Sequence, residues 1–167
     1  AARAVARSFT PVPAWQGGLV VKLDELIDWY QTLTPETVPG IKRIYHEQAH
    51  FRDPFNDVRG QQAIANIFQH MFETTENPVF RISASQCNGK TAWVSWVFDF
   101  SLRGKPVSID GVTRLDFAAD GRVAEHRDYW DTADLFVQLP LLGALMRSLR
   151  KRLCATHGTG SGASSSQ

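Results

Sequence analysis

Two short segments of the chain combine acidic, basic and aromatic side chains in patterns that could support proton transfer. One is residues 51–55, FRDPF, and the other is residues 126–131, HRDYWD. On a strand alternate side chains face the same way, so His126, Asp128 and Trp130 share one face. A carboxylate in an apolar pocket has a raised pKa, because burial disfavours its charged form, and it can then act as a general base. The acidic and imidazole groups that we expect to share such a pocket are Asp53, Asp99, His126 and Asp128.

These residues also have structural interpretations, which the sequence leaves open. Asp-Pro is a common turn initiator, so Asp53 could instead bond to the nearby backbone. Asp128 could be a buried acid paired with Arg127, Arg114 or His126. Tryptophans such as Trp93, Trp96 and Trp130 are usually core residues, although they could also line a pocket for a flat hydrophobic ligand.

Helical spacing of apolar residues predicts three helices in the first half of the chain, with residues 50–55 extended before the third because Asp53 precedes Pro54. Residues 22–33 and 64–76 each carry an apolar stripe, and a shorter helix is expected over residues 41–48. After Pro78 the apolar period changes to two, which predicts strands at 79–86, 91–102, 107–118 and 123–130. Turns are expected at Asn88-Gly89, 103–106 and Asp120-Gly121. A last helical region is expected from residue 131 or 132 to about 153.

This order predicts an α+β fold, in which a strongly curved antiparallel sheet wraps around N-terminal helices and is followed by a C-terminal helix. Both faces of residues 91–102 carry apolar side chains, so we expect one face to cover the helices and the other to meet a second subunit in a homodimer. The expected organisation is a flexible arm over 1–18, one domain over 19–153 and a disordered tail over 154–167.

Composition excludes several classes of protein. The 167 residues carry a net charge of only +1, so no nucleic acid is expected as a partner. All acidic residues precede a basic cluster, Arg147, Arg150, Lys151 and Arg152, which could bring the C-terminal helix to a membrane surface. Two cysteines far apart in the sequence indicate a reducing, cytoplasmic location. Since no Cys/His cluster or phosphate-binding glycine loop is present, we expect neither a metal nor a cofactor.

A larger pattern resembles a known superfamily. Tyr45, Asp53-Pro54, Gly60 and Ile64 are followed by Phe117, residues 120–123 and residues 126–131. This order resembles the nuclear transport factor 2-like superfamily, and within it the SnoaL-like and ketosteroid isomerase-like branch, over residues 19–139. The resemblance implies a cone-shaped sheet around a ligand pocket and a dimer formed through the outer sheet face.

The resemblance also implies roles for individual residues. In ketosteroid isomerases the Asp of the Asp-Pro pair is the general base, which corresponds to Asp53, and Tyr30 matches the tyrosine of their oxyanion hole. The acid that completes that hole is replaced by Thr113, with Asp110 nearby.

Limonene epoxide hydrolases of the same superfamily use two acids and an arginine. Asp128 and Asp99 match the acids, whereas Val97 stands at the arginine position, Phe51 at a tyrosine position and Asp53 at an asparagine position. The complete hydrolase site is therefore absent. SnoaL-like polyketide cyclases need only an acid/base Asp in an apolar cavity.

We therefore expect cofactor-free acid/base catalysis on a small hydrophobic cyclic or carbonyl compound, by an isomerase, a cyclase or an epoxide hydrolase. The alternative is a non-catalytic module of the same fold that binds a ligand or a protein. The candidate catalytic residues are Asp53, Asp128, Asp99, His126 and Tyr30. The candidate substrate-binding residues are Phe51, Phe55, Trp93, Val97, Trp130 and Phe68.

Overall fold

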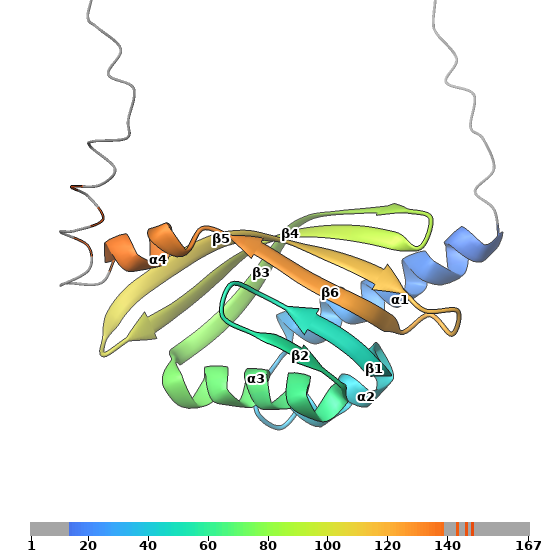
Figure 1. Cartoon of the computed structure of the whole chain (residues 1–167), viewed down its shortest axis with the longest axis horizontal. Coiled ribbons are helices and arrows are strands. Elements are labelled where there is room, and N and C mark those ends of the chain that lie inside the picture. The colour runs from blue at the N-terminus through green and yellow to red at the C-terminus, as the bar shows by residue number, and fades with distance from the viewer. Residues whose placement is uncertain (1–13, 139–142, 144–145, 147, 149–167) are drawn as a thin grey trace, which may run out of the picture. The chain divides into compact units, whose positions relative to one another are not determined.

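Six strands of the computed structural model form one sheet, in the order β2-β1-β6-β5-β4-β3 (Figure 1). The structure describes residues 14–138 together with residues 143, 146 and 148. The strands are β1 (Tyr45–Arg52), β2 (Asp57–Arg59), β3 (Glu76–Asn88), β4 (Thr91–Leu102), β5 (Lys105–Phe117) and β6 (Val123–Trp130). Neighbouring strands are antiparallel except β1 and β6, which are parallel. Because β2 and β3 are its two edges, the sheet is open.

The helices are α1 (Ala14–Gln31), a 3-10 turn (Val38–Gly40), α2 (Ile41–Ile44), α3 (Gln61–Thr74) and α4 (Thr132–Gln138). The predicted α+β class is confirmed, with three helices before the four-strand meander. Helix α1 begins inside the segment that the sequence assigns to the N-terminal arm, and residues 1–13 lie outside the described residues.

Helices α1 and α3 form because each can bury one apolar stripe. In α1 the buried side chains include Leu23, Leu26 and Tyr30, and in α3 they are Ile64 and Phe68. These residues recur at three- or four-residue steps, so they face one side of their helix. Helix α1 packs on β3, and α3 packs on β1 and β3 (Figure 1). The buried stripe of each helix therefore faces the sheet.

The expected hairpin turns of the meander are present. Gly89, Gly104 and Gly121 have φ values of 61°, 73° and 80°, a region that side chains other than glycine's rarely tolerate. Irregular pairing interrupts β3 between Ile82 and Ala84. Such bulges bend a strand and increase its twist, so they help the sheet to curve over the helices.

The second helix is shorter than the sequence predicts. Its periodicity extends to Gln48, but α2 ends at Ile44 and the chain is extended from Tyr45 onward. The cause is tertiary: Tyr45 pairs with Val123 of β6, and Tyr45 and Ala49 are fully buried there. Pairing with a strand nearly 80 positions away leaves no local signal.

The described residues fall into two compact units, one ending at Thr132 and one beginning at Ala133. The sheet and α1 to α3 belong to the first unit. Helix α4 starts at Thr132, as the sequence predicts. Its expected continuation to 153 and the tail over 154–167 lie outside the described residues, apart from 143, 146 and 148. In the described part of the chain, no helix combines the length and apolar character that crossing a membrane requires.

Candidate functional site

Helices α1 and α3 and the face of the sheet that packs on them enclose a small cavity, one side of which is polar. Apolar residues of α1, α3 and four strands line most of it, among them Phe51, Phe68 and Phe80. Its polar lining is Tyr30, Thr113, His126, Asp128 and the indole of Trp96. The cavity measures about 30 Å³, far below the roughly 300–1,000 Å³ of ordinary ligand pockets. A substrate can therefore enter only if some lining side chains move.

A buried imidazole connects two phenols on one side of the cavity. His126 is 3% exposed, and its Nδ1 atom lies 2.8 Å from the hydroxyl of Tyr45 and 3.2 Å from that of Tyr30. The two hydroxyls lie 2.5 Å apart. The rings of Phe51 and Tyr45 stack on the imidazole, with centroid distances of 4.4 and 5.9 Å. These contacts fix the orientation of the His126 ring.

The other imidazole nitrogen faces a carboxylate. Nε2 of His126 lies 2.8 Å from Oδ1 of Asp128, which also accepts a hydrogen bond of 2.5 Å from the Thr113 hydroxyl. Trp96 Nε1 donates in turn to the Thr113 oxygen at 2.8 Å. A continuous chain of hydrogen bonds therefore runs from Tyr30 through His126 and Asp128 to Trp96.

The contacts of the network are compatible with a proton arrangement in which the imidazole donates to Asp128. Nε2–H of His126 donates to Asp128, and Nδ1 accepts from the hydroxyl of Tyr45, which accepts from Tyr30. This assignment follows from the hydrogen-bond pattern. In this arrangement Asp128 accepts hydrogen bonds from both His126 and Thr113 at the cavity wall.

The surroundings keep both phenols protonated. Burial raises the pKa of Tyr30 well above its ordinary value, and the nearby Tyr45 and the charge on Asp128 add to the shift. Burial also raises the pKa of Tyr45, although its hydrogen bond with Tyr30 opposes this effect. Both hydroxyls can therefore donate hydrogen bonds throughout the usual pH range.

Gly111 allows Trp96 to reach the network. Gly111 on β5 pairs with Trp96 on β4, and a Cβ atom built on this glycine would lie 2.3 Å from the indole. The missing side chain lets the indole lie across β5 and donate to Thr113, two residues further along that strand.

The structure brings five of the predicted site residues together. These are Tyr30, Phe51, Phe68, His126 and Asp128, which all line the cavity. The shared face predicted for His126 and Asp128 on a strand is found on β6.

Asp53 does not join them. Its Oδ1 atom accepts hydrogen bonds from the backbone N–H groups of Phe55 and Asn56 at 2.7 and 2.6 Å, and both its oxygens accept from the Asn56 amide. The loop between β1 and β2 therefore holds this carboxylate in a turn, which is the structural interpretation of its Asp-Pro sequence. The expected sharing of one pocket by Asp53 and Asp128 is not found.

Three more predicted site residues lie on the face of β4 that is opposite to the cavity-lining residues Val94 and Trp96. They are Trp93, Val97 and Asp99. Asp99 pairs with Arg81 at 2.5 Å and accepts a hydrogen bond from Ser108. Trp93 is 42% exposed. Strand alternation explains the difference, because odd and even positions of β4 face opposite sides.

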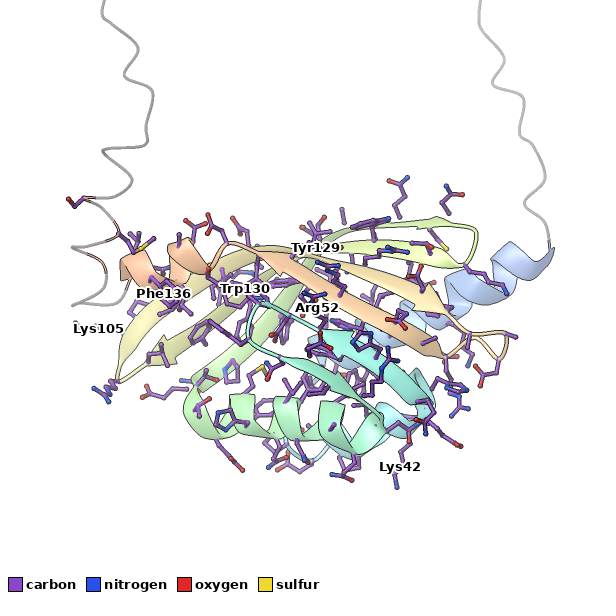
Figure 2. The ribbon with its side chains drawn as sticks, viewed as in Figure 1. Lys42, Arg52, Lys105, Tyr129, Trp130 and Phe136 are labelled. Atoms are coloured by element: carbon purple, nitrogen blue, oxygen red, sulfur yellow. The ribbon has the colours of Figure 1, made fainter. Side chains whose placement is uncertain are left out.

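Phe55 and Trp130 pack on each other outside the cavity lining, with ring centroids 5.3 Å apart. Phe55 is 59% exposed. Trp130 and its neighbour Tyr129, both labelled in Figure 2, come from the end of β6.

Sequence reasoning missed Tyr45 and Phe80 as site residues. Helical spacing assigns Tyr45 to the second helix, whereas it begins β1 in the structure. Its place in the superfamily pattern is the one feature of the sequence that indicates a role at the site. Thr113 was noted only as a replacement for an acid, and in the structure that hydroxyl donates to Asp128. Among the described residues, no cluster of three or more His, Cys, Asp or Glu side chains could hold a metal ion.

Comparison with known proteins identifies relatives of this architecture. Residues 26–126 match the family model described as the SnoaL-like domain. No curated protein sequence matches the chain.

Solved structures match most of the chain at low sequence identity. An LEH-like epoxide hydrolase from M. tuberculosis has a TM-score of 0.61 and 16% identity, covering 80% of this chain and 96% of that one. A proposed SnoaL-like polyketide cyclase from Jannaschia sp. CCS1 has a TM-score of 0.68 and 15% identity, covering 77% and 96%. A protein with a ketosteroid isomerase-like fold from Catenulispora acidiphila, in complex with trimethylamine, has a TM-score of 0.60 and 15% identity, covering 78% and 96%. At these identities the similarity shows the fold.

Proposed function

This chain belongs to the SnoaL-like domain family, and we propose that it catalyses cofactor-free proton transfer on a small hydrophobic cyclic or carbonyl compound. The fold alone does not specify a reaction, because one fold hosts many activities. The observation that carries the proposal is the Tyr45–His126–Asp128 chain of hydrogen bonds beside an apolar cavity.

In this proposal Asp128 is the general base. Its side chain is 16% exposed and is held by His126 and Thr113. The carboxylate removes a proton from the carbon next to a substrate carbonyl and returns it to another atom of the same molecule, so no cofactor is consumed. The Tyr30 hydroxyl, kept protonated by its raised pKa, turns its hydrogen bond from Tyr45 to the enolate oxygen and stabilises that charge.

The cavity favours proton transfer over epoxide opening. Its lining contains one carboxylate and no arginine or lysine. The hydrolase pattern needs two acids and an arginine, and Asp99, the residue expected to supply the second acid, lies on the other sheet face. Isomerase or cyclase chemistry requires only the acid/base group that Asp128 provides.

Hydrogen exchange tests the proposal without knowledge of the natural substrate. In D₂O, NMR would follow deuterium incorporation next to the carbonyl in a panel of cyclic enones, ketones and polyketide-like β-diketones. We expect wild-type protein to accelerate exchange for at least one compound, and Asp128→Asn to lose about 10²- to 10⁴-fold of that rate. Asp99→Asn is the matched control and should retain it within about twofold. Equal rates in wild type and Asp128→Asn would overturn the assignment of Asp128.

A non-catalytic ligand-binding module is the second candidate. It is favoured by the way the cavity's polar groups bond to one another. This function predicts that panel compounds bind to the protein without any exchange above the buffer rate.

A further inference from the structure

A second, larger pocket shares two of its lining side chains with the inner cavity. It measures about 140 Å³ and lies between the ends of α1 and α3 and the start of β3. Tyr30 and Phe80 line both spaces. Tyr30 and Phe80 therefore lie between the two spaces.

The lining of this outer pocket defines the chemistry of a ligand. Leu33, Met71, Phe72 and Pro78 supply apolar surface, while Gln31, Thr32 and Thr34, at and just after the end of α1, are exposed polar residues. None of its lining residues carries a formal charge at neutral pH. Such a pocket favours an uncharged, apolar ring, because burying a charge there would have no compensating partner.

The size of the pocket matches one ring. An engineered protein cavity of about 150 Å³ with an apolar lining binds benzene. The outer pocket is therefore large enough for the body of a small cyclic molecule, whereas the inner cavity of about 30 Å³ is not.

Of the two shared side chains, Phe80 is the one that can move. Its ring stacks on Phe98 at 4.3 Å and meets the edges of Tyr30 and Trp96 at 5.8 Å each. Tyr30 is tied to Tyr45 and His126 by hydrogen bonds, whereas Phe80 is only half-buried and has no polar tether. Turning this ring costs stacking contacts but breaks no hydrogen bond.

We propose that the outer pocket binds the apolar ring of an uncharged substrate and that displacement of Phe80 joins it to the inner cavity. The polar atom of the ligand then reaches Tyr30 and Asp128, while the ring remains against Met71 and Phe72. This inference rests on the proposed function for the chemistry that follows binding, but the binding itself does not require turnover. Phe80 is in this view a specificity-determining residue, since its position limits the size of the ring.

Binding of simple aromatic probes tests the inference. The chain has two methionines, so ¹³C-methyl methionine labelling gives two NMR signals, and Met71→Leu assigns the one from Met71. We expect benzene to shift the Met71 signal saturably in wild type and in Asp128→Asn. The variant Leu33→Phe, which enlarges a buried side chain of the pocket lining, should weaken benzene binding at least tenfold, whereas Leu33→Met should bind as wild type does.

Naphthalene tests the role of Phe80. Phe80→Ala should bind this two-ring probe at least tenfold more tightly than wild type, with a smaller change for benzene. The inference is overturned if benzene leaves the Met71 signal of folded wild-type protein unmoved, or if Phe80→Ala gains nothing for naphthalene. Probe binding in a protein that shows no hydrogen exchange would support the pocket while contradicting the proposed function.

Discussion

The Nε2 atom of His126 lies 2.8 Å from Oδ1 of Asp128, two residues further along the same strand. Same-strand neighbours at this spacing face one side, so β6 alone positions the pair. The partners that complete the network come from α1, β1 and β5 through Tyr30, Tyr45 and Thr113. The acid/base pair is thus local, while its hydrogen-bonding environment depends on the whole sheet and the first helix.

Removing the imidazole should destabilise the fold. In His126→Leu, Asp128 loses a donor and Tyr45 loses its acceptor inside the protein, where each unsatisfied group costs roughly 1–3 kcal/mol. We expect the free energy of unfolding to fall by about 3 kcal/mol in urea titrations. Tyr129→Phe, at a residue that is 41% exposed, should change it by less than about 0.5 kcal/mol. Equal effects of the two substitutions would contradict the importance of the network.

Stability should decrease at alkaline pH because of Tyr30 and Tyr45. Their pKa values are raised in the folded protein, so their contribution to stability is complete below the ordinary tyrosine pKa of about 10 and is lost as pH rises toward the folded values. Over that range each tyrosine should lower the free energy of unfolding by about 1.4 kcal/mol per pH unit. Urea titrations at several pH values measure this slope, and Tyr45→Phe should reduce it. If the free energy of unfolding falls as steeply with pH in Tyr45→Phe as in wild type, the Tyr45 phenol is not the group responsible.

Glycine should be needed at position 111 because the Trp96 indole occupies the space that a side chain there would fill. The added methyl of Gly111→Ala would overlap the indole, so we expect a loss of about 1–3 kcal/mol in the free energy of unfolding. In a Trp96→Leu background the same substitution should cost less than about 0.5 kcal/mol. A double-mutant cycle by urea unfolding measures the difference, and equal costs in both backgrounds would exclude this packing explanation.

Asp53 should contribute to the stability of the fold and not to the hydrogen exchange that the protein catalyses on its substrate. Asp53→Ala removes the acceptor of two backbone N–H groups and should cost about 1–2 kcal/mol, whereas Asp53→Asn keeps an oxygen for them and should cost less. Both variants should retain wild-type exchange rates. A rate loss in Asp53→Asn comparable to that in Asp128→Asn would restore Asp53 as a catalytic candidate.

The outer sheet face should form a homodimer. Trp93 and Tyr129 are exposed there and stack on each other at 6.2 Å, with the Arg127 guanidinium 4.9 Å from the Tyr129 ring centre. Large exposed aromatic side chains of this kind are typical of interfaces. Sedimentation velocity should show a dimer that Trp93→Glu converts to monomer, while Gln69→Glu on the exposed side of α3 has no effect. A monomer in the wild type would contradict this prediction.

Patterns within single elements predicted much of the fold. The change from helical to alternating spacing at Pro78 located the meander, and the glycine turns fixed its hairpins. The same local reasoning placed His126 and Asp128 on one face. It could not place Tyr45, because that residue becomes extended only through pairing with β6.

Strand alternation explains why two candidates suggested by the resemblance, Val97 and Asp99, do not line the cavity. Val97 and Asp99 were aligned with site positions by resemblance, but their odd positions on β4 face away from Val94 and Trp96. The outer pocket had no sequence signal at all, because it is assembled from the ends of α1, α3 and the start of β3. Residues that meet across three elements share no spacing that a periodicity could reveal.

The parallel pairing of β1 with β6 has a consequence for how the chain folds. Tyr45 and His126 are 81 positions apart, and Tyr30 and His126 are 96 apart. During synthesis, β1 emerges long before the strand that covers its free edge, so this edge stays open to other chains until β6 is made. The last strand therefore joins β1 and β2 to the rest of the sheet and assembles the hydrogen-bond network in the same step, which makes the network a marker of completed folding.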